Sequence, residues 1–200
     1  MKPVKDKILI GITGVIASGK SLVTNYLKDL GYYTISADVV NRELLLKEVH
    51  IRKVNALLFN INSDILDKKE VRRLIFNDSD ARLKLEGYLH PLIKLKIFEL
   101  IKKSKEKVIF VEVPLLFEAN YLFFDKIITV YSPNNVILER LMIRDNIKKE
   151  EAKKLINSQI DIDKKVSLSD YVIDNTKGVE NTKKEVLKIL EEMEKEYGNL

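Results

Sequence analysis

The feature that most constrains this chain is a short loop between a predicted strand and a predicted helix. Residues 14–21 read GVIASGKS and match the pattern G-x4-G-K-[ST] in full. The apolar run Lys7–Ile12 before them predicts a buried strand, and a helix should follow to about Leu30, with Gly31 just past its end. This strand–loop–helix context is the one in which the pattern forms a phosphate-binding loop. We therefore expect a site for a nucleoside triphosphate.

The chemistry of such a loop explains each fixed position. Glycines let backbone N–H groups turn inward around phosphate oxygens, and the N-terminus of the following helix adds a partial positive charge. Lys20 can reach the β- and γ-phosphates and so serve catalysis, and the Ser21 hydroxyl can ligate Mg²⁺. The residues expected to bind ATP here are Gly14, Val15, Ile16, Ala17, Ser18, Gly19, Lys20 and Ser21.

The rest of the chain predicts an α/β fold. Four further short segments are rich in apolar, β-branched or aromatic residues: Tyr32–Ser36, Val108–Val113, Ile127–Tyr131 and Tyr171–Asp174. Apolar strands separated by helices are typical of a parallel sheet covered on both faces. The predicted fold is a three-layer P-loop NTPase core with a parallel five-stranded sheet.

Two stretches with helical periodicity interrupt this alternation, and we interpret them as insertions into a single domain. The first spans about 39–105. The second spans about 134–166 and is interpreted as a lid that would exclude water from the γ-phosphate of a bound nucleotide. The predicted core then comprises about 1–38, 106–133 and 167–200.

Composition excludes several classes of protein. The chain has no cysteine, which excludes disulfides and cysteine nucleophiles, and with only His50 and His90 it cannot form a multi-histidine zinc site. No run approaches the roughly 18–20 apolar residues of a membrane span, and Met1–Asp6 is charged and unlike a signal peptide. We expect a soluble, cytoplasmic protein with no membrane partner.

The charge of the chain favours an anionic ligand without selecting one. The net charge is +5, from 35 basic and 30 acidic residues, and the excess is concentrated in residues 91–107 and 140–165. These segments lack interleaved aromatic residues beyond Phe98, which disfavours base stacking. We therefore expect no nucleic-acid partner.

Other motifs indicate which kind of P-loop protein the chain is. The N-K-x-D and D-x-x-G motifs of P-loop GTPases do not occur. A short core, a helical insertion after the second strand and an arginine-bearing lid fit a small-molecule kinase better. Two alternatives stay open: a nucleoside monophosphate kinase with the same core, and a nucleotide-gated switch that uses the basic segments.

Several motifs together resemble the dephospho-CoA kinase family and span nearly the whole chain. In order they are GITGVIASGKS, ISAD, LEGYLHPLI, VEVPLLFEA, ERLMIRDN, INSQ and DYVIDN. The resemblance implies an enzyme that uses ATP and Mg²⁺ to phosphorylate the 3′-hydroxyl of the ribose of dephospho-CoA. It also implies that the first insertion binds this acceptor. We expect a monomer or a weak homo-oligomer.

Asp38 follows the second predicted strand and is the expected catalytic carboxylate. Ligands of parallel sheets bind outside the carboxyl ends of the strands, so Asp38 should emerge beside the phosphate loop. There it can orient the attacking hydroxyl and accept its proton, and the resemblance implies the same role in substrate binding and catalysis. The alternative is a cap for the helix at Val39, and the two roles are compatible.

Glu112 is a charge within an apolar run, so it lies either near Mg²⁺ or in a structural ion pair. The family usually has Asp at this position, although the longer Glu112 could still hold the metal through water. The turn Pro114–Glu118 should line the acceptor pocket, with Leu115 and Phe117 binding the substrate. Packing of these side chains in the core is the alternative.

His90 precedes Pro91, so the backbone there should leave the helical region. The resemblance implies that His90 binds the acceptor, whereas a lone histidine at a helix end is otherwise a cap or a core contact.

Arg140 and Arg144 lie four residues apart and should share one face of a lid helix. Guanidinium groups on a closing lid can neutralise the charge that develops during phosphoryl transfer, so we predict catalytic roles for both. Arg140 should also bind ATP, and it could stack on adenine. The alternative for both is a salt bridge to Glu139 or Asp145.

Two further residues complete the family pattern near the nucleotide, and two others depart from it. Asn175 is expected to bind ATP, and Gln159 is expected close by. The family loop usually reads closer to TGGIGSGKS, so Val15 and Ala17 replace glycines here. Both occupy variable positions of the general pattern, so phosphate binding should survive.

Overall fold

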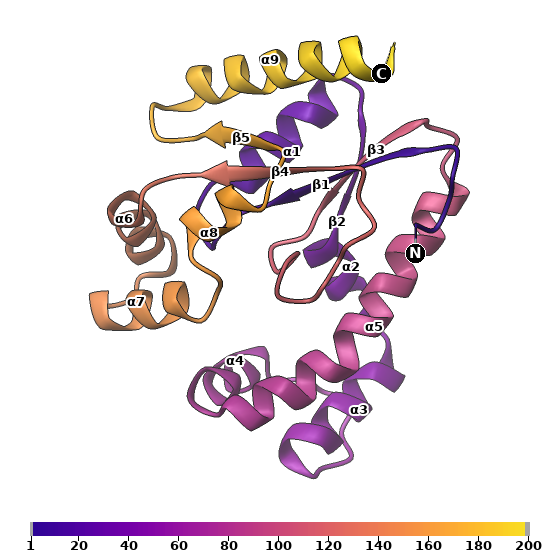
Figure 1. Ribbon diagram of the computed structural model, residues 1–200. Helices are drawn as coiled ribbons and strands as arrows, with labels where there is room; N and C mark the ends of the chain where they lie inside the picture. The colour runs from indigo at the N-terminus through magenta and orange to yellow at the C-terminus, as the bar shows by residue number, and fades with distance from the viewer. Residues whose placement is uncertain (1, 199–200) are drawn as a thin grey trace. The chain divides into compact units, whose positions relative to one another are not determined.

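The computed structural model describes residues 2–198, which form a parallel sheet flanked by helices (Figure 1). The ends of the predicted core, residue 1 and residues 199–200, lie outside the described residues. The strands are β1 (Ile8–Thr13), β2 (Tyr33–Ser36), β3 (Val108–Glu112), β4 (Lys126–Tyr131) and β5 (Tyr171–Asp174). The helices are α1 (Lys20–Asp29), α2 (Ala37–Leu44), α3 (Glu48–Phe59), α4 (Lys68–Asn77), α5 (Ser79–Lys103), α6 (Asn134–Asp145), α7 (Lys149–Asn157), α8 (Ile162–Ser167) and α9 (Val179–Tyr197).

The sheet has the order β2-β3-β1-β4-β5, and every pairing is parallel. The five predicted strands are confirmed, each within a residue or two of its expected bounds. Strand β1 is central, pairing with β3 from Ile8↔Val108 onward and with β4 from Ile10↔Lys126 onward. The carboxyl ends of these strands therefore meet at one edge of the sheet, where the loop after β1 begins.

Different elements cover the two faces of the sheet, as the predicted three-layer fold requires. One face packs against α1 and α9 in a continuous apolar core. That core contains Ile10, Ile12, Val23, Leu27, Val108, Phe110, Ile128, Val130, Ile173, Val186, Ile189, Leu190 and Met193. On the other face, the Thr129 hydroxyl hydrogen-bonds to Ser169 Oγ at 2.6 Å and donates to Lys165 O of α8 at 3.4 Å. Side chains alternate along β4, which places Thr129 opposite Ile128 and Val130.

The chain divides into two compact units. One comprises the residues up to Ser36 together with those from Ile101 onward, and it holds the whole sheet. The other, Ala37–Leu100, is helical and contains α2, α3, α4 and most of α5.

The predicted break at His90–Pro91 is wrong, because α5 runs through both residues. A proline inside a helix costs about 3 kcal/mol, since it removes one hydrogen bond and crowds the preceding turn. Leu89, Ile93 and Ile97 are buried at intervals of four residues, and their packing favours a continuous helix across the proline. Although α5 has 25 residues, neither it nor any other helix within residues 2–198 is long and apolar enough to cross a membrane.

Candidate active site

The phosphate loop connects β1 to α1 and holds three residues at positive φ. These are Gly14 (φ +146°), Ala17 (φ +61°) and Gly19 (φ +102°). Gly19 is the N-cap of α1, and no side chain caps this end of the helix. In the first turn Leu22 N donates to Gly19 O at 3.0 Å, whereas the N–H groups that precede it have no side-chain cap and can bind an anion, which the helix dipole also favours.

Gly14 and Gly19 cannot be replaced without moving their surroundings. A Cβ on Gly14 would lie 2.6 Å from Ser18 Oγ and 2.6 Å from the backbone oxygen of Val130. A Cβ on Gly19 would run into the side-chain amide of Asn175. The two fixed glycines of the pattern are thus required by close approach as well as by backbone conformation.

Gly14→Ala is expected to lower the free energy of unfolding by more than about 2 kcal/mol, because it combines positive φ with a backbone clash. Ala17→Gly is the matched control: it relieves strain at Ala17 but makes the unfolded chain more flexible, so the change should stay within about 1 kcal/mol. Urea unfolding followed by circular dichroism measures both. A Gly14→Ala protein as stable as the parent would contradict the close approach.

Val15 and Ala17, the two loop positions that depart from the glycines of the resemblance, contact helices α6–α8. Val15 is buried in a small apolar cluster with Ile137 of α6 and Ile162 of α8, and Ala17 and Ile156 pack against it. The side chains thus add apolar contacts between the phosphate loop and α6–α8 that glycine could not make.

Lys20 is folded back over the phosphate loop. Its Nζ donates to Gly14 O at 3.0 Å and to Val15 O at 2.8 Å, and the residue is buried. The ammonium is therefore held at the inner rim of the loop. Phosphate oxygens entering the loop would compete with these carbonyls for the same donors.

Ser21 and Glu112, the predicted Mg²⁺ ligands, belong to adjoining elements. Ser21 is exposed in the first turn of α1, and Glu112 is the buried last residue of β3. Thr24, three residues after Ser21 on the same helix, donates to Glu112 Oε2 at 3.4 Å. One hydroxyl and one carboxylate fit the requirements of Mg²⁺, which keeps several waters and shares substrate phosphates.

Arg140 and Asn175 converge on the phosphate loop. The guanidinium of Arg140 donates to Ser132 Oγ at 3.0 Å and to Asn175 O at 2.8 Å. The Asn175 side-chain amide donates to Ser18 O at 2.8 Å and accepts from Thr182 Oγ1 at 2.7 Å. The structure thus brings an arginine of α6, the residue after β5 and the loop into one hydrogen-bonded network.

Ser132 and Thr182 belong to this network and were missed by the sequence analysis. Ser132 directly follows β4, so the rule that functional groups gather at the carboxyl ends of parallel strands could have found it. Thr182 carries no comparable signal. Arg144 stays outside the network: it forms a salt bridge with Asp145 at 2.8 Å, and about half of its side chain is exposed.

Arg140→Ala should lower stability by about 1–3 kcal/mol, because two charge-assisted hydrogen bonds are lost and a buried serine hydroxyl loses its donor. Arg144→Ala, the matched control four residues along the same helix, should change stability by less than about 0.5 kcal/mol, as exposed ion pairs usually do. Thermal unfolding of both variants without nucleotide tests this. Equal melting temperatures for the two would show that the Arg140 contacts contribute nothing.

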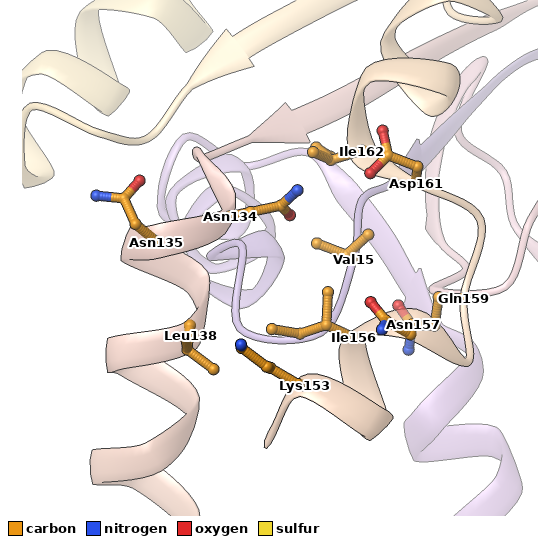
Figure 2. Close-up of a pocket in the computed structure, with 10 residues that line it drawn as sticks. All are labelled: Val15, Asn134, Asn135, Leu138, Lys153, Ile156, Asn157, Gln159, Asp161 and Ile162. Carbon is orange, nitrogen blue, oxygen red and sulfur yellow. The ribbon is translucent and has the colours of Figure 1, made fainter. Parts of the chain in front are cut away.

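Gln159 lies where α7 ends and binds the loop directly. Its Oε1 accepts a hydrogen bond from Ile16 N at 2.9 Å. Beside it is a pocket of about 540 Å³, and Figure 2 shows Val15 between the side chains of Asn134 and Ile156 there. The pocket is lined by Val15, Asn134, Asn135, Leu138, Lys153, Ile156, Asn157, Gln159, Asp161 and Ile162. It offers amide groups and apolar walls next to the phosphate loop.

The turn after β3 presents the two predicted acceptor-binding side chains. Leu116 is fully buried, whereas Leu115 and Phe117 on either side of it are half-buried. The alternative of complete core packing therefore holds for Leu116 and not for its neighbours.

Asp38 and His90 belong to the helical unit. Asp38 is exposed in the first turn of α2, which begins at Ala37, so Asp38 lies inside the helix rather than at its N-cap. His90 is half-buried within α5. The same unit contains a contact between His50 Nδ1 and Tyr88 Oη at 2.7 Å, which the sequence did not indicate.

The fold and the site together define a class of protein. A phosphate loop after the central strand of a five-stranded parallel sheet, with helical segments contacting that loop, is the architecture of the P-loop small-molecule kinases. Comparison with known families is more specific: the family model described as Dephospho-CoA kinase matches residues 8–181. The chain belongs to the dephospho-CoA kinase family.

Individual relatives agree with this assignment. A dephospho-CoA kinase of Listeria innocua is 36% identical over 190 residues, which cover 91% of this chain and 95% of the relative. Among solved structures, the dephospho-CoA kinase from Campylobacter jejuni is 31% identical, with a TM-score of 0.63 over 94% of this chain and 98% of that one. A Thermus thermophilus protein has a TM-score of 0.82 at 27% identity, with the same shares covered.

Proposed function

We propose that this protein transfers the γ-phosphoryl group of ATP to the 3′-hydroxyl of the ribose of dephospho-CoA, giving CoA and ADP. The observation that carries the proposal is a phosphate loop with Gly14, Gly19 and Lys20 in place, in a chain of the dephospho-CoA kinase family.

The nucleotide is held by the sheet-bearing unit. Backbone N–H groups of the loop and of the start of α1 surround the phosphates, apart from those of Ile16 and Ser18, which donate to Gln159 Oε1 and Val15 O. The ammonium of Lys20 leaves its carbonyl acceptors for the β- and γ-phosphates. Arg140 and Asn175 line the same loop. Ser21 and Glu112 would hold Mg²⁺, which neutralises charge on the β- and γ-phosphates when it is bound.

The acceptor is bound and activated by a second group of residues. Asp38 orients the ribose hydroxyl and takes its proton, while His90, Leu115 and Phe117 bind the rest of dephospho-CoA. The 3′-oxygen forms a bond to the γ-phosphorus as the bond from that phosphorus to the β–γ bridging oxygen breaks. Arg140 and Arg144 neutralise the charge that develops on the transferred group.

We also infer a cytoplasmic protein that acts as a monomer or weak homo-oligomer, with neither membrane nor nucleic acid as a partner. The modest net charge of +5 and the scarcity of aromatic residues in the basic segments, where Phe98 stands alone, support the absence of a nucleic-acid partner.

Acceptor-dependent ADP release tests the proposed reaction. Dephospho-CoA should stimulate ATP consumption with equal amounts of ADP and CoA formed, and the product should carry a 3′-phosphate. Equal stimulation by AMP, CMP or dTMP would overturn the proposal in favour of a nucleoside monophosphate kinase. No stimulation by any acceptor would favour a nucleotide-gated switch.

A further inference from the structure

A buried ion pair joins α8 to the turn after β3. The Lys165 side chain is fully buried, and its Nζ lies 2.8 Å from Glu118 Oε1. The same ammonium donates to Glu118 Oε2 at 3.0 Å and to Pro114 O at 2.9 Å. All three residues lie in the sheet-bearing unit.

This single ammonium binds two residues, Pro114 and Glu118, that flank the acceptor-binding side chains of the turn. Pro114 is the first residue of the turn, which runs on to Asn120, and Glu118 lies within it, directly after Phe117. Between them, Leu116 packs directly on the central strand, since a Cβ at Gly11 would lie 2.7 Å from Leu116 Cδ1. Pro114, Leu116 and Glu118 are thus each anchored, and Leu115 and Phe117 lie between these anchored residues.

Glu118 extends the same connection toward the phosphate loop. Its Oε1 accepts a hydrogen bond from Ile160 N at 3.0 Å. Ile160 follows Gln159, whose side chain binds Ile16 N of the loop. The turn and the phosphate loop are therefore linked through Glu118 and one short segment of chain.

Stability alone does not account for a charge at this position. Taking an ammonium out of water costs several kcal/mol, and apolar residues of similar volume often replace a buried ion pair without loss of stability. Burial lowers the pKa of Lys165, and Glu118 opposes that shift through its hydrogen bond and its charge. What an apolar side chain could not do is hold a carbonyl and a carboxylate at fixed positions.

We infer that Lys165 is a positioning residue for the phosphoryl acceptor, fixing Leu115 and Phe117 through Pro114 and Glu118. The inference rests on the proposed function. It assigns Lys165 no contact with the substrate and no part in proton transfer.

Steady-state kinetics with each substrate varied in turn test the inference. Lys165→Met should raise the KM for dephospho-CoA about tenfold or more, since small displacements of positioning groups have large kinetic effects. The KM for ATP and the Kd for ADP should change by less than about threefold, because the phosphate loop keeps its own contacts. Lys165→Arg, which keeps the charge and the donors, should restore most of the acceptor affinity.

The exposed neighbour Lys164 provides the matched control, and Lys164→Met should leave both KM values unchanged. KM does not depend on the fraction of folded enzyme, so a purely structural role would lower kcat while leaving the KM for dephospho-CoA near the parent value. That result would overturn the inference. An inactive parent enzyme would instead count against the proposed function.

If Lys165→Met does not fold, two further variants still test the inference. Glu118→Gln keeps the size of the side chain and most of its hydrogen bonds, and we expect a smaller rise in the KM for dephospho-CoA, about threefold to tenfold. Lys165→Met combined with Glu118→Leu removes both charges and should fold, yet still show the raised KM. A parental KM in either variant would refute the positioning role.

Discussion

Lys20→Ala is expected to lower ATP affinity and kcat together, with kcat/KM falling about 10²–10³-fold, the scale of losing a key charge-stabilising donor. The ammonium sits at the rim of the phosphate loop, 2.8 Å from Val15 O, and it would hold the β- and γ-phosphates in both the ground state and the transition state. Isothermal titration with a non-hydrolysable ATP analogue, paired with steady-state kinetics, measures both quantities.

Lys28→Ala, on the exposed surface of the same helix α1, is the matched control and should change neither quantity. Parental ATP affinity in a folded Lys20→Ala protein would show that the ammonium remains on its carbonyl acceptors when nucleotide binds.

Asp38→Asn should leave ATP affinity near the parent value while kcat falls about 10²–10⁴-fold, the usual cost of removing a general base. The substitution keeps the size of the side chain and removes its charge and basicity. A loose phosphoryl transition state needs little help from a base, so a loss near the lower bound would indicate that orientation of the hydroxyl is the larger effect.

Glu43→Gln, which neutralises another exposed carboxylate of α2, is the control for a change in local charge. Near-parental kcat in folded Asp38→Asn enzyme would remove Asp38 from catalysis. Because α2 begins at Ala37, Asp38 would then be an ordinary residue of the first helical turn rather than a cap.

The parts of the fold that the sequence predicted well are those set by local pattern. Short β-branched apolar runs such as VIFVE favour buried strands, and the spacing of Gly14, Gly19 and Lys20 has one common structural solution. The family motifs extended this to the partners of the loop, and Asn175 does lie against Ser18.

The rest depended on contacts between residues far apart in the chain. Proline before a continuing apolar stripe predicts a break, yet tertiary packing of Leu89 and Ile93 keeps α5 whole. Likewise, nothing near Lys165 in the sequence distinguishes it from the exposed Lys164, because its partner Glu118 lies 47 residues away. In a lysine-rich chain, neither composition nor periodicity distinguishes the few buried lysines from the many exposed ones.

The strand order has a consequence for synthesis of the chain. Strand β2 pairs with β3, and β1 pairs with β3 and β4, so Ile8 finds its partner Val108 only after the whole helical unit has been made. At a synthesis rate of about 5–20 residues per second, β1 and β2 remain without the strand that pairs with them for on the order of 10 s. During that interval two apolar segments have unpaired backbone groups, a state prone to aggregation. Nascent chains arrested before residue 108 should therefore depend on chaperones for solubility, whereas chains extended past β4 should not.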